Sequence, residues 1–171
     1  MLLGAIEAGG TKFVCAIGDE EMTIKERVSF PTTTPEETMA LVIDFFKKYE
    51  DQLVGIGIGS FGPIDIHRDS ATYGYITSTP KLAWQNFDFV GTMKQAFPIP
   101  IAWTTDVNAA AYGEYVFGKG KGLSSVVYYT IGTGVGGGAL QDGRFVEGFS
   151  HPEMGHMPVS YTHLRAHETL R

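Results

Sequence analysis

The segment from Glu7 to Lys12 combines residue types that suit the binding of a phosphate group. Its paired glycines, Gly9 and Gly10, lie between two apolar runs, so the backbone can turn sharply there and present amides to an anion without a Cβ in the way. Thr11 and Lys12 add a hydroxyl and a positive charge. For these six residues alone, an ordinary hairpin turn with an exposed lysine is an equally good interpretation.

A second glycine-rich segment, Gly132 to Gly138, follows an apolar run and matches the letter pattern of a dinucleotide-binding fingerprint, as does the segment from Gly57 to Gly62. That fingerprint must open a helix, so that the pyrophosphate meets the helix N-terminus. Here one run leads into a predicted strand and the other into Pro63. The sequence therefore predicts a strand-turn-strand phosphate clamp that includes Gly132, Thr133 and Gly134.

Asp106 follows a predicted strand at 101–105 and precedes a predicted helix from near Asn108 to Phe117. A carboxylate between two such elements is held rigidly and can accept a proton, although an aspartate there more often caps the helix. We expect Asn108 to be the cap, which leaves Asp106 for chemistry. Phosphoryl transfer needs phosphate-binding turns and one carboxylate that accepts the substrate hydroxyl proton, and the chain offers both.

The segment from His151 to His156 gathers two imidazoles and the carboxylate of Glu153 in six residues. These groups are able to bond sugar hydroxyls or to supply one metal ligand. By themselves they form a polar loop, and no complete metal site can be built from them.

Hydrophobic periodicity predicts an α/β chain. The predicted strands cover residues 2–6, 13–17, 22–30, 53–58, 101–105, 125–131 and 135–140, with a hairpin turn at 141–144. A capping box at Thr34 and Glu37, with Pro35 in the first position, predicts a helix start, and Asn86 is expected to cap a second helix that runs to about Phe97. Residues 65–85 are polar and irregular. We place a first domain at residues 1–118 and the start of a second at 119–159.

The amino-acid composition limits the kinds of molecule that this chain is expected to bind. The 171 residues are 43% hydrophobic and 19% charged, enough for one compact core and the start of another. The formal net charge of −6 argues against nucleic acid and against an anionic membrane, and so favours a small-molecule substrate. Cys15, the single cysteine, lies in an apolar run and is expected to be a buried thiol. With no leader and no apolar run of roughly 20 residues, we expect a cytoplasmic protein.

With these motifs in view, the sequence resembles the ROK family of bacterial sugar kinases and regulators, and within it the fructokinase branch. The resemblance covers about Met1 to Val159. Its strongest marks, in chain order, are residues 7–12, 57–63, 104–110, 132–138 and 151–156. The preference for fructose rests on Thr72 to Lys81 and Trp84 to Asp88. Residues 160–171 look foreign to the family, because they stand where a cysteine-rich zinc segment and the rest of the second domain are expected.

The resemblance implies an actin-like ATPase (ribonuclease H-like) fold of two α/β domains, of which this chain carries the first and the start of the second. It implies that Asp106 is the general base, and that Gly9 to Lys12 and Gly132 to Gly134 bind ATP. It also implies that Asn108, Glu153 and His156 contact the sugar and that His156 is one zinc ligand. The missing cysteines leave that zinc site incomplete here.

The activity that the resemblance implies is ATP- and Mg²⁺-dependent phosphorylation of a hexose, fructose to fructose 6-phosphate, by a full-length homodimeric parent that also holds Zn²⁺. A glucokinase or hexokinase of broader specificity is an alternative within the same family. A sugar-sensing repressor is another, but such regulators need an N-terminal DNA-binding segment, and here the first predicted strand begins at Leu2. The chain by itself is expected to be inactive, since an unpaired second domain leaves apolar faces uncovered.

Overall fold

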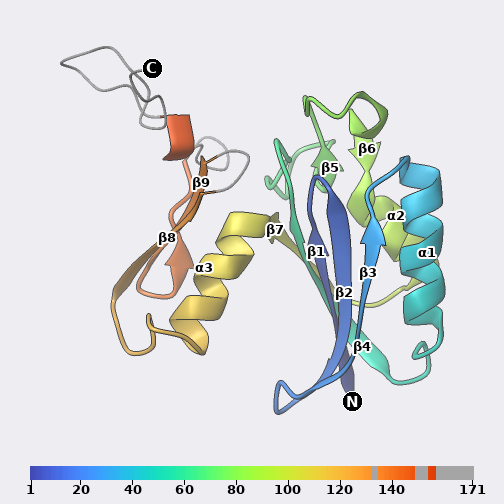
Figure 1. Ribbon diagram of the computed structural model, residues 1–171, viewed down its shortest axis with the longest axis horizontal. Helices are drawn as coiled ribbons and strands as arrows, with labels where there is room; N and C mark the ends of the chain where they lie inside the picture. The colour runs from blue at the N-terminus through green and yellow to red at the C-terminus, as the bar shows by residue number, and fades with distance from the viewer. Residues whose placement is uncertain (132–134, 149–153, 157–171) are drawn as a thin grey trace. The chain divides into compact units, whose positions relative to one another are not determined.

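A computed structural model describes residues 1–131, 135–148 and 154–156, with only the backbone of His156 (Figure 1). The chain divides into two compact units, Met1–Asp106 and Val107–Arg171. The division falls just inside a helix that the sequence assigned to the first domain. The boundary after residue 118 stays a prediction, as does the tail at 160–171, which lies outside the described residues.

The first unit is built on a five-stranded mixed sheet of order β3-β2-β1-β4-β7. The strands are β1 (Leu2–Ala8), β2 (Lys12–Asp19), β3 (Ile24–Pro31), β4 (Leu53–Ser60) and β7 (Ile101–Thr105). The first three pair antiparallel, whereas β4 and β7 run parallel to β1. Along β1 the side chains alternate: Ile6 and Ala8 are buried, and Glu7 between them is exposed. One face of the sheet is therefore the core face.

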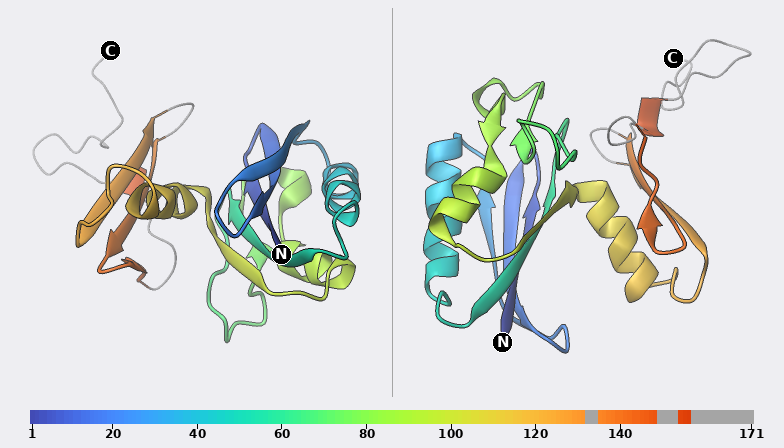
Figure 2. Two further views of the ribbon diagram at one scale, coloured as in Figure 1. Left: turned by 90° about the horizontal axis from the view of Figure 1, so that it is seen from below. Right: turned by 180° about the vertical axis from the view of Figure 1, so that it is seen from behind.

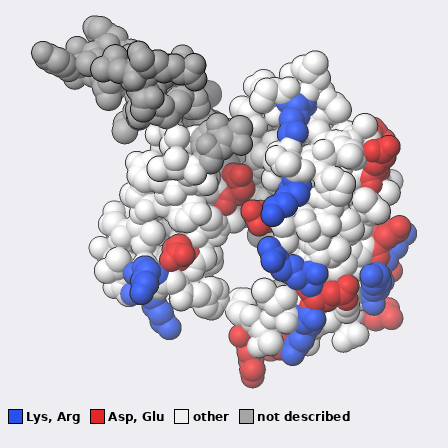
Figure 3. Space-filling model, in the orientation of Figure 1, with Lys and Arg blue, Asp and Glu red and all other residues white. Residues whose placement is uncertain are grey.

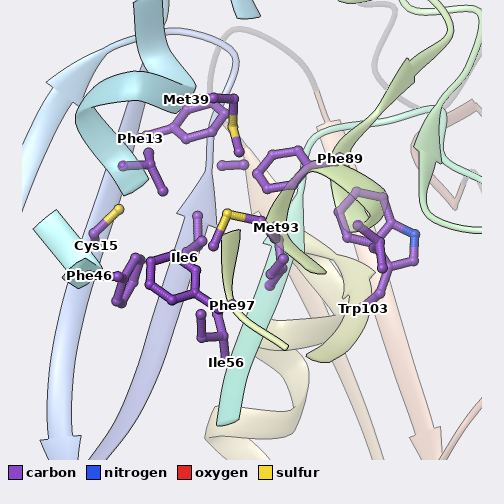
Figure 4. Packing of buried hydrophobic residues seen from close by; sticks show 14 of the residues in the cluster. Ile6, Phe13, Cys15, Met39, Phe46, Ile56, Phe89, Met93, Phe97 and Trp103 are labelled. Atoms are coloured by element: carbon purple, nitrogen blue, oxygen red, sulfur yellow. The ribbon is translucent and has the colours of Figure 1, made fainter. Parts of the chain in front are cut away.

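Two helices, α1 (Pro35–Lys47) and α2 (Phe89–Ala96), cover the same face of this sheet (Figure 2). The predicted start of α1 is confirmed, because Thr34 Oγ1 accepts from the amide of Glu37 at 3.4 Å and Pro35 is in the first turn. Between the helices and the strands, Phe46 and Phe97 meet edge to face in the buried cluster that also contains Ile6 and Ile56 (Figure 4).

The predicted cap of the second helix is wrong. Asn86 has a left-handed φ of 57°, and the helix begins three residues later, after the short strand β6 (Phe87–Asp88). Asp88 is the cap, since its Oδ1 accepts from the amide of Gly91 at 2.8 Å. Both residue types cap helices well, and only the backbone conformation decides between them.

Residues 65–85 are largely irregular, as predicted, but they pack against the core. They contain β5 (Tyr75–Ile76), which pairs with β6, and the single 3₁₀ turn η1 (Leu82–Trp84). Trp84 is 1% exposed and lies against the rings of Phe13, Phe61 and Phe87. The segment thus contributes one of the largest side chains of the core.

The second unit contains α3 (Asp106–Val116) from Val107 onward and a three-stranded antiparallel sheet of order β10-β9-β8. Its strands are β8 (Ser125–Ile131), β9 (Val135–Gln141) and β10 (Arg144–Phe145), and the 3₁₀ turn η2 (Met154–His156) follows. The predicted turn between β9 and β10 is confirmed: Asp142 and Gly143 both have positive φ, 50° and 75°, as a type I′ turn requires.

Basic and acidic side chains lie side by side over the first unit (Figure 3). Lys25 pairs with Asp19 at 2.7 Å, and Lys48 lies 3.9 Å from Glu26. Cys15 is fully buried, as predicted, and burial raises the pKa of its thiol to about 12. Among the described residues, the helices are too short or too polar to span a lipid bilayer.

Candidate active site

The parallel register of three neighbouring strands brings two of the predicted site segments to one edge of the sheet. Ala8 at the end of β1 pairs with Ser60 at the end of β4, and Ser60 pairs with Thr105 at the end of β7. Gly9 and Asp106 each follow directly. Since adjacent strands lie about 4.8 Å apart, these two chain exits are about 10 Å apart across the sheet. Ligands of open α/β sheets bind outside this carboxyl edge.

The turn at Gly9 to Lys12 is closed by its own backbone. The amide of Gly9 donates to the carbonyl of Lys12 at 3.0 Å, and a Cβ added at Gly9 would lie 2.7 Å from that same oxygen. Only glycine therefore fits this position without a shift of the backbone. Within the described residues, no hydrogen bond donated by the amides of Gly10 or Thr11 is found. These two amides remain as donors for an anion.

The loop between β3 and α1 forms hydrogen bonds with this turn. The amide of Thr32 donates to the carbonyl of Thr11 at 3.0 Å, and the Thr32 hydroxyl donates to the carbonyl of Gly9 at 2.7 Å. The next residue, Thr33, accepts at its carbonyl from the indole of buried Trp84 at 2.8 Å. The turn is thereby tied to the core, and a rigid turn presents its donors to an anion with little loss of entropy.

Asp106 is the first residue of α3 and is partly buried. A carboxylate in the first turn is favoured there by the positive end of the helix dipole. The expectation that Asn108 caps this helix is wrong. Because the helix already begins at Asp106, Asn108 lies inside the first turn, where it is 1% exposed. A buried amide in this position is compatible with the predicted sugar contact, which stays a prediction.

The second predicted phosphate loop lies between two paired strands. Strands β8 and β9 pair antiparallel up to Ile131 and Val135, so the described chain on either side of residues 132–134 is strand, as predicted. Gly57 to Ser60 likewise lie within β4 and open no helix. Gly132, Thr133 and Gly134 themselves lie outside the described residues, as do Glu153 and the side chain of His156.

The part of the chain that the structure describes does not form a structural zinc site. No group of three or more His, Cys, Asp or Glu side chains suited to a metal comes together in residues 1–131, 135–148 and 154–155. Cys15 is buried in the core of the first unit. Among the residues that the structure describes, the donor set does not amount to the four ligands of a structural zinc site.

Three residues beside the Gly9 turn were not assigned to it from the sequence: Thr32, Trp84 and Lys81, the last two of which were named only within the segments that indicate fructose. The Cε of Lys81 would lie 3.2 Å from a Cβ added at Gly10. A tryptophan in a segment otherwise polar was a usable signal, because so large an apolar side chain is seldom left in solvent. Nothing in the local sequence pattern predicts that Thr32 or Lys81 lies beside the glycine turn.

Residues 3–168 match the ROK family. The chain belongs to the ROK family. It is 58% identical over 156 residues to a fructokinase of Streptococcus mutans, which covers 91% of this chain and 53% of that protein. A fructokinase of Pediococcus pentosaceus is 54% identical over 160 residues, covering 94% of this chain and 55% of the other.

The crystal structure of a ROK family glucokinase from Streptomyces griseus, in complex with glucose and AMPPNP, superposes with a TM-score of 0.78 at 28% identity. The match covers 93% of this chain and 51% of the glucokinase. The predicted α/β kinase fold and the predicted family are thus confirmed. This ROK chain spans about half the length of the curated relatives that it matches.

Proposed function

We propose that a protein carrying this chain transfers the γ-phosphate of ATP to a hexose, converting fructose to fructose 6-phosphate. The observation that carries the proposal is the common edge of β1 and β7, where the glycine turn and Asp106 leave the sheet about 10 Å apart. A phosphate group and the hydroxyl that attacks it both fit within such a span. The 58% identity to a fructokinase favours fructose over other hexoses.

In the proposed reaction, Asp106 accepts the proton of the sugar hydroxyl as the hydroxyl oxygen forms a bond to the γ-phosphorus. The bond from that phosphorus to the β,γ-bridging oxygen breaks, and ADP leaves with the electron pair. The amides of Gly10 and Thr11, with the charge of Lys12, stabilise the negative charge on the transferring group. Mg²⁺ bound with ATP would offset the charge of the phosphates.

The remaining site assignments belong to the same proposal. Gly132, Thr133 and Gly134 would bind ATP as the second phosphate loop, and Asn108, Glu153 and His156 would contact the sugar. Zn²⁺ bound through His156, a homodimeric assembly and a cytoplasmic location are proposed for the longer protein only. A surface of mixed charge supports a small-molecule partner rather than nucleic acid.

The test is a chimera in which this chain replaces the matched 156-residue part of the Streptococcus mutans fructokinase. Coupled ADP release is measured with fructose and with glucose. We expect fructose-dependent turnover, and the Asp106→Asn chimera should lose at least about 10³-fold in kcat while fructose still binds. The matched control is Asp51→Asn, which removes an exposed carboxylate from a turn between α1 and β4. Turnover of the Asp106→Asn chimera within tenfold of the parent would refute the role of the carboxylate.

A further inference from the structure

Lys81 reaches the glycine turn from a distant part of the chain. Its Cε would lie 3.2 Å from a Cβ built on Gly10, so the stem of the lysine runs against the backbone of the turn. Its ammonium nitrogen is one bond further on. Lys81 is partly buried, and no ion pair of the described residues involves it. The Lys81 side chain therefore reaches the turn whose Gly10 and Thr11 amides have no hydrogen-bond acceptor among the described residues.

The backbone of Lys81 is held in place on both sides. Its amide donates to the hydroxyl of Thr79 at 3.3 Å, and its carbonyl accepts from the amide of Trp84 at 2.8 Å. Thr79 is 1% exposed, and its carbonyl accepts from the Gln85 side chain at 2.9 Å. Because Lys81 begins a 3₁₀ turn that contains the buried Trp84, the position of its backbone is fixed. Its long side chain needs less ordering to meet a ligand than one on a mobile loop.

The chemistry of this corner suits an oxyanion with several negative charges. The amides of Gly10 and Thr11 supply two donors, Lys12 at the end of the turn supplies one positive charge, and Lys81 supplies a second. Hydrogen bonds from a charged donor to phosphate are stronger than those between neutral groups. A terminal phosphate of an oligophosphate fits this combination better than a carboxylate of single charge does.

We infer that Lys81 is a binding residue for the phosphate group held at the Gly9–Lys12 turn, and that its ammonium donates directly to a phosphate oxygen. The identity of this group as the one transferred from ATP rests on the proposed function. The binding of an oligophosphate by the turn and Lys81 does not.

The experiment uses the 171-residue chain and sodium tripolyphosphate as the probe, followed by amide NMR and by titration calorimetry. The signals of Gly10 and Thr11 should shift on titration. Lys81→Met keeps the length and apolar stem of the side chain but removes the charge, and it should weaken binding about tenfold or more. Lys81→Arg should restore most of the affinity. Lys94→Met, which removes an exposed charge from α2, is the matched control and should change the affinity less than twofold.

The inference is overturned if Lys81→Met and Lys94→Met bind tripolyphosphate equally well, or if the parent chain gives no shifts at the turn. Should Lys81→Met unfold, Lys81→Gln takes its place under the same criteria. This assay measures binding without sugar and without turnover, so a negative result is independent of the proposed function. If the chimera turns over fructose but Lys81→Met does not weaken tripolyphosphate binding, only this inference is refuted. If Lys81→Met weakens tripolyphosphate binding but the chimera does not turn over, only the kinase assignment is refuted.

Discussion

Trp84 joins the core of the first unit to the glycine turn, so its replacement by phenylalanine tests how the candidate site is supported. Its indole nitrogen donates to the carbonyl of Thr33 at 2.8 Å, and its ring contacts four phenylalanines. Trp84→Phe keeps one aromatic ring in the core. It removes the hydrogen bond and leaves a cavity beside Phe13 and Phe61.

The expected cost follows from these two losses. Truncating a buried tryptophan to alanine costs about 3–5 kcal/mol, and a phenyl ring retains more than half of the packing, which leaves about 1–2 kcal/mol for the cavity. The carbonyl that loses its donor adds about 1 kcal/mol. We therefore expect a loss of about 2–3 kcal/mol. With a urea m-value of roughly 1.5 kcal/mol/M for a unit of this size, the midpoint should fall by about 1.3–2 M.

The second tryptophan provides a matched control. Trp103 is 9% exposed, and its indole nitrogen donates to the carbonyl of Asp65 at 2.9 Å. Trp103→Phe loses the same kind of bond at a less enclosed position, so its cost should be smaller. The chain has two tryptophans, so each variant retains one fluorescent reporter of unfolding. A loss below about 0.5 kcal/mol for Trp84→Phe would show that the Thr33 carbonyl is hydrated and that the cavity closes.

Two further predictions concern the core of the first unit. Gly74 has a φ of +90°, and a Cβ there would overlap the side chain of Val90, so Gly74→Ala should lower thermal stability far more than Gly57→Ala, whose Cβ would meet nothing within 4 Å. Equal melting temperatures of the two variants would contradict this account. Burial raises the pKa of Cys15 from 9.0 to about 12, so the buried thiol stabilises the fold fully below pH 9 and loses that contribution as the pH rises towards 12. Above pH 9 the free energy of unfolding should fall by up to about 1.4 kcal/mol per pH unit more than it does in Cys15→Ala. Ellman's reagent should react with the thiol at pH 8 only after urea is added. Rapid labelling of the folded chain would contradict the burial.

The sequence alone was sufficient where local chemistry decides the outcome. The helix start at Thr34 and Pro35, the hairpin turn at Asp142 and Gly143, and the placement of Gly57 to Ser60 in a strand each depend on residues close together in the chain. Hydrophobic periodicity predicted the strands and the first helix, because side-chain burial follows the period of each element. The motifs around Gly9 and Asp106 identified the family before any fold was known.

Tertiary structure decided whatever depends on residues far apart in sequence. The choice of Asp88 over Asn86 as a cap followed from the backbone path into β6, and Asn108 is interior because α3 begins at Asp106. The proximity of Lys81 to Gly10 arises only once Trp84 is packed into the core, some seventy residues along the chain from the turn that it supports. Spacing along a sequence does not encode such contacts, since they form through the burial of side chains between elements.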